Sequence, residues 1–338
     1  MKRNLIFILV IPLLFASCSD DFLQRNPTKS VTDSNFFNSE TELELYSNGF
    51  YSYVPGGTDL MATDFTASDN IEVSTYSAFL AGVRTVPASG GGWSWTTLRN
   101  INYFLAHYRK ADIALDRLNY YEGFAKFFRA WFYFEKIKMF GDVPWYSEPL
   151  ETTSEELYKG RDSRTVVADS ILVDLDRAIR YLGTAKSPTR ISRWTALALK
   201  SRFCLYEGTY RKYHPELGLT ESAERFLTEC VNASAELIAD GGYSAYNTGK
   251  ISDYGDMFTA TAPNAEFILA RTYDKALSMV HSMNYVLLNS TYYAGAGMTR
   301  QMVESYLMKD GTFFSSRPGA DRMTFAEECA NRDLRLAQ

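Results

Sequence analysis

Apolar residues recur at helical spacing through most of the chain up to residue 240, and this period constrains the fold more than any other feature of the sequence. Leu43, Tyr46 and Phe50, for example, follow one another at intervals of three and four residues, which is the pattern of one face of an α-helix. Gly141 is a typical helix stop, because glycine adopts the left-handed conformation that ends many helices. The period predicts helices over residues 38–51, 96–118, 123–140, 164–182, 192–208 and 221–240.

The last two predicted helices form a pair that resembles a tetratricopeptide-type unit, with small residues where they would cross. The aromatic cluster around Phe128 and Trp131 repeats at helical spacing and is expected in the core.

Residues 53–95 lack a helical period, and a loop of that length is usually functional or disordered. Residues 266–274 are expected to form a strand. We therefore predict a mostly α fold with a helical-repeat core, irregular loops and few short strands.

The N-terminus has the features of a secretory signal. Lys2 and Arg3 precede an apolar run over residues 5–15, which small residues follow. That run is shorter than the about 20 apolar residues that a transmembrane helix needs. The small residues directly before Cys18 resemble the bacterial lipobox, after which a cysteine carries acyl chains that anchor a protein to a membrane. The alternative is an ordinary cleaved signal with an incidental cysteine.

The charge balance argues against a nucleic-acid partner. The chain has 35 basic and 40 acidic residues, a net charge of −5, and no basic stripe that would neutralise a phosphate backbone. Its three histidines are isolated. The three cysteines after Cys18 are odd in number, widely spaced and without a C-x-x-C pair, which argues against a zinc site or a disulfide framework. No phosphate-binding or dinucleotide-binding motif occurs, so we expect no cofactor and no metal. A carboxylate pair for glycoside hydrolysis remains open, because such pairs meet only in the fold.

Aromatic residues supply the candidate ligand-binding groups. Trp93 and Trp95 follow a run of glycines, and flat indole faces on such a loop suit stacking on sugar rings. The alternative for either tryptophan is a role in packing. Asn100 and Asn102 lie shortly after them and carry amides for sugar hydroxyls, but a helix that buries Ile101 leaves at most one of them well placed. Further candidates are Tyr76, Arg84, Tyr292 and Tyr293.

Five segments in order along the chain resemble the SusD/RagB family of outer-membrane nutrient-binding lipoproteins. The most distinctive is the helix and turn FRAWFYFEKIKMFGDVPWYSEPL at residues 128–150. The others lie at residues 18–51, 194–208, 237–246 and 331–336. Members of that family continue well beyond the last of these segments, so the resemblance implies that this chain is truncated at its C-terminus.

The resemblance implies a SusD-like fold and a lipid anchor. The implied divisions are a lipoprotein signal peptide, an N-terminal helical-repeat region and a partial C-terminal region, at residues 1–17, 18–245 and 246–338. Lipidation would occur at Cys18, and the acidic run that follows would act as a surface-export signal, formed by Ser19, Asp20 and Asp21. The alternative for this run is a solvated linker.

The implied function is the capture of oligosaccharides at the cell surface and their delivery to a TonB-dependent, SusC-like transporter in the outer membrane. The protein would lie over the transporter as a lid and would bind glycan without cleaving it. Three alternatives remain. They are a peptide-binding RagB-type lipoprotein, a surface glycoside hydrolase and a helical-repeat scaffold with no small ligand.

Overall fold

The computed structural model describes residues 36–59, 67–72, 77–289 and 296–337. Six longer helices make up the first two thirds of this part, namely α2 (Glu40–Asn48), α4 (Thr96–His107), α5 (Leu115–Phe140), α6 (Arg164–Tyr181), α7 (Arg193–Tyr213) and α8 (Ala223–Asp240). Four short helices follow, namely α9 (Asp253–Thr259), α10 (Met283–Leu288), α11 (Arg300–Ser305) and α12 (Phe325–Cys329). The predicted mostly α fold is confirmed.

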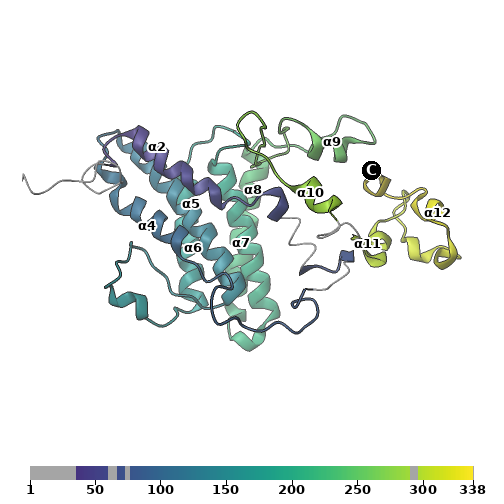
Figure 1. Ribbon diagram of the computed structural model, residues 1–338, viewed down its shortest axis with the longest axis horizontal. Coiled ribbons are helices and arrows are strands. Elements are labelled where there is room, and N and C mark those ends of the chain that lie inside the picture. The colour runs from purple at the N-terminus through teal and green to yellow at the C-terminus, as the bar shows by residue number, and fades with distance from the viewer. Residues whose placement is uncertain (1–35, 60–66, 73–76, 290–295, 338) are drawn as a thin grey trace, which may run out of the picture.

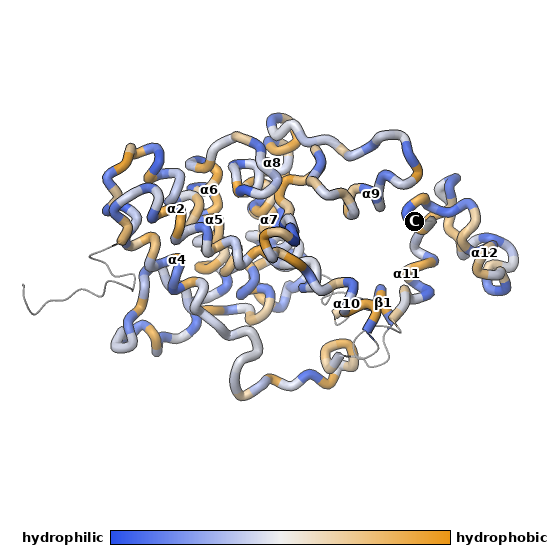
Figure 2. Tube along the Cα trace, turned by 45° about the horizontal axis from the view of Figure 1, so that its top comes forward, coloured by the Kyte–Doolittle hydropathy of each residue, from blue (hydrophilic) through white to orange (hydrophobic). Residues whose placement is uncertain are grey.

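The longer helices pack in chain order. α5 lies along α6, α6 along α7, and α7 along α8, while α4 and α2 pack against α5 (Figure 1). The segments that carry α9 to α12 extend from one side of this bundle as irregular chain (Figure 2). Two residues of β1 (Ile71–Glu72) pair antiparallel with two of β2 (Gly297–Met298), which ties the segment before α4 to the C-terminal part.

Aromatic side chains of α5 form the centre of the core. Phe128 is fully buried and contacts the rings of Phe50 and Phe124 at centroid distances of 5.8 and 5.4 Å. Phe134 contacts the ring of Phe203 on α7 edge to face, at a centroid distance of 5.3 Å. Trp131 differs from the expectation, because it is only half-buried and packs on the outside of this cluster.

Gly123 and Gly208, which bounded two of the predicted helices, lie inside α5 and α7. The predicted helix over residues 96–118 ends at His107, and α5 then runs without a break through Gly123. A Cβ at Gly123 would lie 2.9 Å from the Cβ of Tyr181, so this glycine allows a close crossing of α5 and α6. Gly208 has the same role, because a Cβ there would lie 2.8 Å from the side chain of Leu227 in α8.

The serines and glycines that were predicted to cap helices lie at helix ends in the structure. The hydroxyls of Ser39 and Ser163 accept hydrogen bonds from backbone N–H groups three residues on, as N-caps do. Gly141 ends α5 as predicted and has a positive φ of 69°, but its ψ of −118° lies outside the left-handed helical region. α8 stops at Gly241 as predicted, but the residue with positive φ is Gly242.

The predicted strand over residues 266–274 is wrong. Within the described residues this segment is irregular, and its one ladder contact is an isolated bridge between Asp274 and Met279. Ile268 instead packs against the cluster of Trp194 and Leu197 on α7. Apolar residues in the segment therefore serve side-chain packing against a helix and not pairing with a strand.

The three cysteines in the described part of the chain are free thiols. Cys204 is fully buried, and burial raises the pKa of its thiol to about 12, as expected for a thiol that packs as a small apolar group. Cys230 and Cys329 are also free. The described ranges contain no cluster of three side chains that would hold a metal ion. None of the helices in those ranges is long and apolar enough to cross a membrane.

The aromatic core gives a direct stability prediction. Phe128→Ala is expected to lower the free energy of unfolding by about 3–5 kcal/mol, because it leaves a cavity in the packed centre. Phe325→Ala is the matched control, since that side chain is 80% exposed, and its effect should stay below about 0.5 kcal/mol. Urea denaturation followed by circular dichroism measures both. Equal effects of the two changes would contradict the assignment of α5 as the centre of the core.

Candidate functional site

A pocket of about 590 Å³ opens where the chain enters α4. One wall is the first part of α4 with the tryptophan loop before it, and the other is the irregular chain that follows α5. The residues that line the pocket are Trp93, Trp95, Thr96, Leu98, Arg99, Asn102, Pro144, Tyr146, Glu148, Leu150, Leu157, Lys159, Gly160 and Arg161. The size is that of an ordinary small-ligand site.

The two tryptophans have different roles in this pocket. Trp95 is half-buried and packs against Phe132 and Tyr146, both at a centroid distance of 5.7 Å. Trp93 remains 38% exposed and meets Trp95 edge to face at 5.1 Å and Phe140 at 4.8 Å. Trp95 therefore anchors the loop to the core, and Trp93 offers indole surface to the pocket.

The glycines before Trp93 let the loop come close to α5. Gly90, Gly91 and Gly92 all have positive φ values, of 75°, 58° and 84°. A Cβ at Gly92 would lie 2.6 Å from the sulfur of Met139, and the positive φ would strain any larger residue at this position. The Lys136 ammonium donates a hydrogen bond to the carbonyl oxygen of Gly92, and burial lowers the pKa of this lysine. The loop is thereby held against the last turns of α5.

Arg161 covers part of the exposed tryptophan. Its guanidinium lies 5.0 Å from the centroid of the Trp93 ring, within the range of a cation–π contact. One of its terminal nitrogens, Nη1, donates to the carbonyl oxygens of Phe140 and Asp142, both at 3.4 Å. An aromatic face and a guanidinium are thus placed together at one side of the pocket.

The wall opposite the tryptophans is held by a buried amide. Asn102 is 1% exposed, and its Nδ2 donates to the carbonyl oxygens of Tyr146 and Glu148 at 2.9 and 3.2 Å. Its Oδ1 accepts a hydrogen bond from Arg129 of α5 at 3.2 Å. Both donors and the acceptor of this amide are therefore used within the protein. Asn102 fixes the pocket wall and is not free to bind a ligand.

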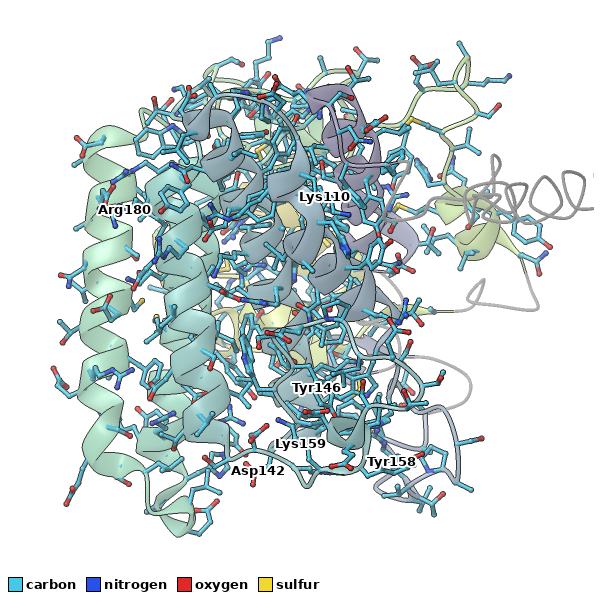
Figure 3. The ribbon with its side chains drawn as sticks, turned by 90° about the vertical axis from the view of Figure 1, so that its left-hand side faces the viewer. Lys110, Asp142, Tyr146, Tyr158, Lys159 and Arg180 are labelled. Atoms are coloured by element: carbon cyan, nitrogen blue, oxygen red, sulfur yellow. The ribbon has the colours of Figure 1, made fainter. Side chains whose placement is uncertain are left out.

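Lys159 connects the two irregular segments of the wall. Its ammonium donates to the carbonyl oxygen of Trp145 at 2.8 Å and to the carboxylate of Asp162 at 2.7 Å, and it lies 5.0 Å from the Tyr146 ring centroid. Burial alone would raise the pKa of Asp162, but the hydrogen bonds from Lys159 and from the Trp145 N–H hold that pKa below its usual value. Figure 3 shows Tyr146 and Lys159 together at one end of the helices.

Comparisons with known proteins agree with this fold. Residues 21–205, more than half of the chain, match the SusD-like family model described as "Starch-binding associating with outer membrane". The chain belongs to the SusD-like family. A SusD-like protein of Bacteroides ovatus is 22% identical over 253 residues, which are 71% of this chain and 46% of that protein. SusD-like protein P38 of Formosa agariphila is 21% identical over 239 residues, or 66% of this chain and 46% of that protein. The chain thus spans about half the length of these SusD-like relatives.

Solved structures show the same SusD-like fold. A SusD-like protein of Bacteroides fragilis superposes with a TM-score of 0.69 at 21% identity, covering 92% of this chain and 62% of that one. A structure described as a laminarin binding SusD-like protein superposes with a TM-score of 0.55 at 20% identity, covering 69% and 51% of the two chains. The family and fold that the five sequence segments implied are confirmed.

The structure brings only some of the predicted site residues of this SusD-like chain together. Trp93 and Trp95 line the pocket, whereas Asn100 is exposed on α4 and does not line it. Arg84 is also exposed, on the segment between β1 and α4, and is not among the lining residues. The remaining candidates lie outside the described residues, namely Cys18, Ser19, Asp20, Asp21, Tyr76, Tyr292 and Tyr293. Their roles stay predictions.

Sequence reasoning missed the second wall of the pocket. Tyr146 and Glu148 belong to the most distinctive family segment, and Lys159 and Arg161 follow shortly after it. The proline and paired aromatics at residues 144–146 were a usable signal, because they mark a rigid turn next to the aromatic helix. Arg161 carried no comparable signal, since only the fold places it over Trp93.

The amide of Asn102 gives the second prediction. Asn102→Leu is expected to cost about 1–3 kcal/mol of stability, because it removes the donor of two hydrogen bonds to the Tyr146 and Glu148 carbonyl oxygens and leaves the buried Arg129 guanidinium without one of its acceptors. Amide hydrogen exchange should also become faster in residues 144–150. Asn100→Leu, on the exposed side of the same helix, is the matched control and should change neither quantity. If the two variants behave alike, the wall of the pocket does not depend on Asn102.

Proposed function

We propose that this protein binds an oligosaccharide in the pocket beside Trp93 and delivers it to a TonB-dependent, SusC-like transporter of the outer membrane. The observation that carries the proposal is the exposed indole of Trp93 in a pocket of about 590 Å³ that polar side chains also line. The name of one structural neighbour, a laminarin binding SusD-like protein, supports a glycan as the ligand.

The chemistry of the pocket suits a sugar. A sugar ring has apolar C–H faces and a rim of hydroxyls, so it needs a flat apolar surface together with hydrogen-bonding groups. Trp93 and Trp95 supply the flat surface, and Arg99, Glu148 and Lys159 supply charged hydrogen-bonding groups around it. Because Arg161 lies over the Trp93 ring, a sugar either stacks beside the guanidinium or displaces it.

The same lining supports binding without cleavage. Glycoside hydrolysis uses a pair of carboxyl groups that flank the scissile bond. Among the described residues, Glu148 is the one carboxylate that lines the pocket. Two acids next to the lining are already paired: Asp162 is hydrogen-bonded to Lys159 and to the Trp145 backbone, and Glu151 lies 3.5 Å from Arg99. The proposed role is therefore that of a binding protein and not of an enzyme.

The proposal includes a lipid anchor at Cys18 and exposure on the cell surface, with Ser19, Asp20 and Asp21 as the export signal. The family description, "associating with outer membrane", supports an outer-membrane location. We also propose that residues 18–245 form the N-terminal helical-repeat region and residues 246–338 part of a C-terminal region. The fully buried apolar residues of the two core clusters all lie between Phe37 and Ala233, which supports this division.

Isothermal titration calorimetry tests the proposed site. A panel of tetrasaccharides first identifies one that binds the full chain, and a panel of tripeptides tests the RagB-type alternative. Trp93→Ala should then weaken binding of that tetrasaccharide about tenfold or more, or about 1.4 kcal/mol, because it removes the exposed aromatic surface. The helical signal in circular dichroism should stay unchanged, since Trp93 is the less buried of the two indoles.

Tyr158→Ala is the matched control for Trp93→Ala. Tyr158 is 86% exposed and lies between Leu157 and Lys159 in the sequence, but it does not line the pocket. Its removal should leave the affinity unchanged. Binding of tripeptides alone, or full affinity in Trp93→Ala, would count against a glycan site at this loop.

Membrane fractionation tests the proposed anchor. Cys18→Ala should move the protein from the membrane fraction to the soluble fraction and abolish labelling by a palmitate analogue, because the acyl chains lose their attachment point. Cys230→Ala is the control, since that thiol is free in the structure and lies within α8. A Cys18→Ala protein that stays in the membrane fraction and keeps its label would refute lipidation at this residue.

A further inference from the structure

We propose that the oligosaccharide bound in this pocket is acidic, carrying carboxylate or sulfate groups, and that Arg161 is the side chain that selects it. This inference rests on the proposed function, because it names the class of glycan that the same site would take. It concerns the charge of the ligand, which the indole surfaces do not determine.

The lining of the pocket carries more positive than negative charge. Arg99, Lys159 and Arg161 are its cations, and Glu148 is its carboxylate among the described residues. The chain as a whole has a net charge of −5, so this local excess of cations runs against the overall balance.

Two of these cations are already neutralised by acids of the protein. The Arg99 guanidinium lies 3.5 Å from the carboxylate of Glu151, and the Lys159 ammonium lies 2.7 Å from that of Asp162. They support the wall of the pocket more than they attract a ligand. Arg161 is therefore the lining cation left to attract an anionic group, and Glu148 is the lining carboxylate that opposes it.

Arg161 has no carboxylate partner among the described residues. Within this part of the structure it makes two long hydrogen bonds, from Nη1 to the carbonyl oxygens of Phe140 and Asp142, and it approaches the Trp93 ring. The same part of the structure offers no acceptor to its Nε or Nη2, and the side chain is exposed at the pocket. A guanidinium presents its N–H groups as a planar fork that fits a carboxylate or sulfate through two hydrogen bonds.

The position of Arg161 over Trp93 links charge recognition to sugar binding. Contact with the indole orients the guanidinium, so less side-chain freedom is lost when an anion binds. A sugar ring that packs beside the indole brings an acidic substituent within reach of this fork. Because Arg161 is exposed to solvent, a neutral sugar does not leave a buried charge unpaired. The geometry therefore predicts a preference for acidic glycans and not the exclusion of neutral ones.

Removing the charge of Glu148 should change the affinity for an acidic ligand in the direction opposite to removing the charge of Arg161. It is exposed and lines the same pocket, and its carboxylate repels an anionic ligand. Glu148→Gln should strengthen binding of an acidic oligosaccharide, whereas Arg161→Gln should weaken it. A merely structural role of either residue would not produce opposite changes in affinity that depend on the charge of the sugar.

Calorimetry on the full chain with paired probes makes the test. The carboxylate pair is tetragalacturonate and its fully methyl-esterified form, and the sulfate pair is a carrageenan tetrasaccharide and its desulfated form. We expect the acidic member of at least one pair to bind about tenfold more tightly than its neutral counterpart at low salt, and the difference to shrink in 0.5 M salt. Arg161→Gln should abolish that difference, and Glu148→Gln should enlarge it.

Arg180→Gln is the matched control for Arg161→Gln. It removes the same charge from an exposed arginine in the last turn of α6, far from Lys159 in Figure 3. It should leave the preference intact. A preference for only the carboxylate or only the sulfate pair supports the inference and identifies the acidic group. Equal binding of acidic and neutral members, with no effect of Arg161→Gln, overturns it while the proposed glycan function stands. Binding of no oligosaccharide at all overturns both.

Discussion

Arg129 of α5 and Asp174 of α6 form a buried ion pair on which the walls of the candidate site depend. Two nitrogens of the guanidinium donate to the two carboxylate oxygens at 2.6 and 2.8 Å, and both side chains are almost fully buried. Burial alone would lower the pKa of Arg129, but Asp174 outweighs that effect and holds the pKa above its usual value. The third nitrogen donates to Asn102 of α4 and to the carbonyl oxygen of Ser147, both at 3.2 Å. One guanidinium thus joins two neighbouring helices to the chain that forms the pocket wall.

This arrangement explains how irregular chain forms a defined site. Residues 144–150 have no regular secondary structure, so their backbone groups need partners elsewhere. Asn102, Arg129 and the Tyr133 hydroxyl supply those partners from α4 and α5. A buried ion pair adds little net stability over apolar packing, but losing one partner typically costs about 3–5 kcal/mol. We therefore interpret the pair as a positioning device, which places the wall of the pocket opposite the tryptophan loop.

The sequence predicted the parts of the fold that local chemistry determines and missed those that depend on neighbours. The apolar period located every longer helix, because a helix face must be buried whatever it packs against. Gly123 was misread as a boundary, since glycine marks both helix ends and close helix crossings, and only the position of Tyr181 tells them apart. Trp93 and Trp95 were predicted as site residues from their glycine-rich loop, and they do line the pocket. Arg161 was missed because its contact with Trp93 joins segments far apart in the chain.

The central claim is that ligand binds at the tryptophan loop, and fluorine NMR tests it most directly. The chain has five tryptophans, and labelling with 5-fluorotryptophan gives each a resonance that single Trp→Phe variants assign. Trp93 and Trp95 line the pocket, whereas Trp194 packs in a separate cluster on α7 and Trp131 on the outside of the aromatic core. On titration with a bound tetrasaccharide, the resonances of Trp93 and Trp95 should shift in a saturable way, and those of Trp131 and Trp194 should not move. Saturable binding that leaves the resonances of Trp93 and Trp95 unchanged would contradict the account.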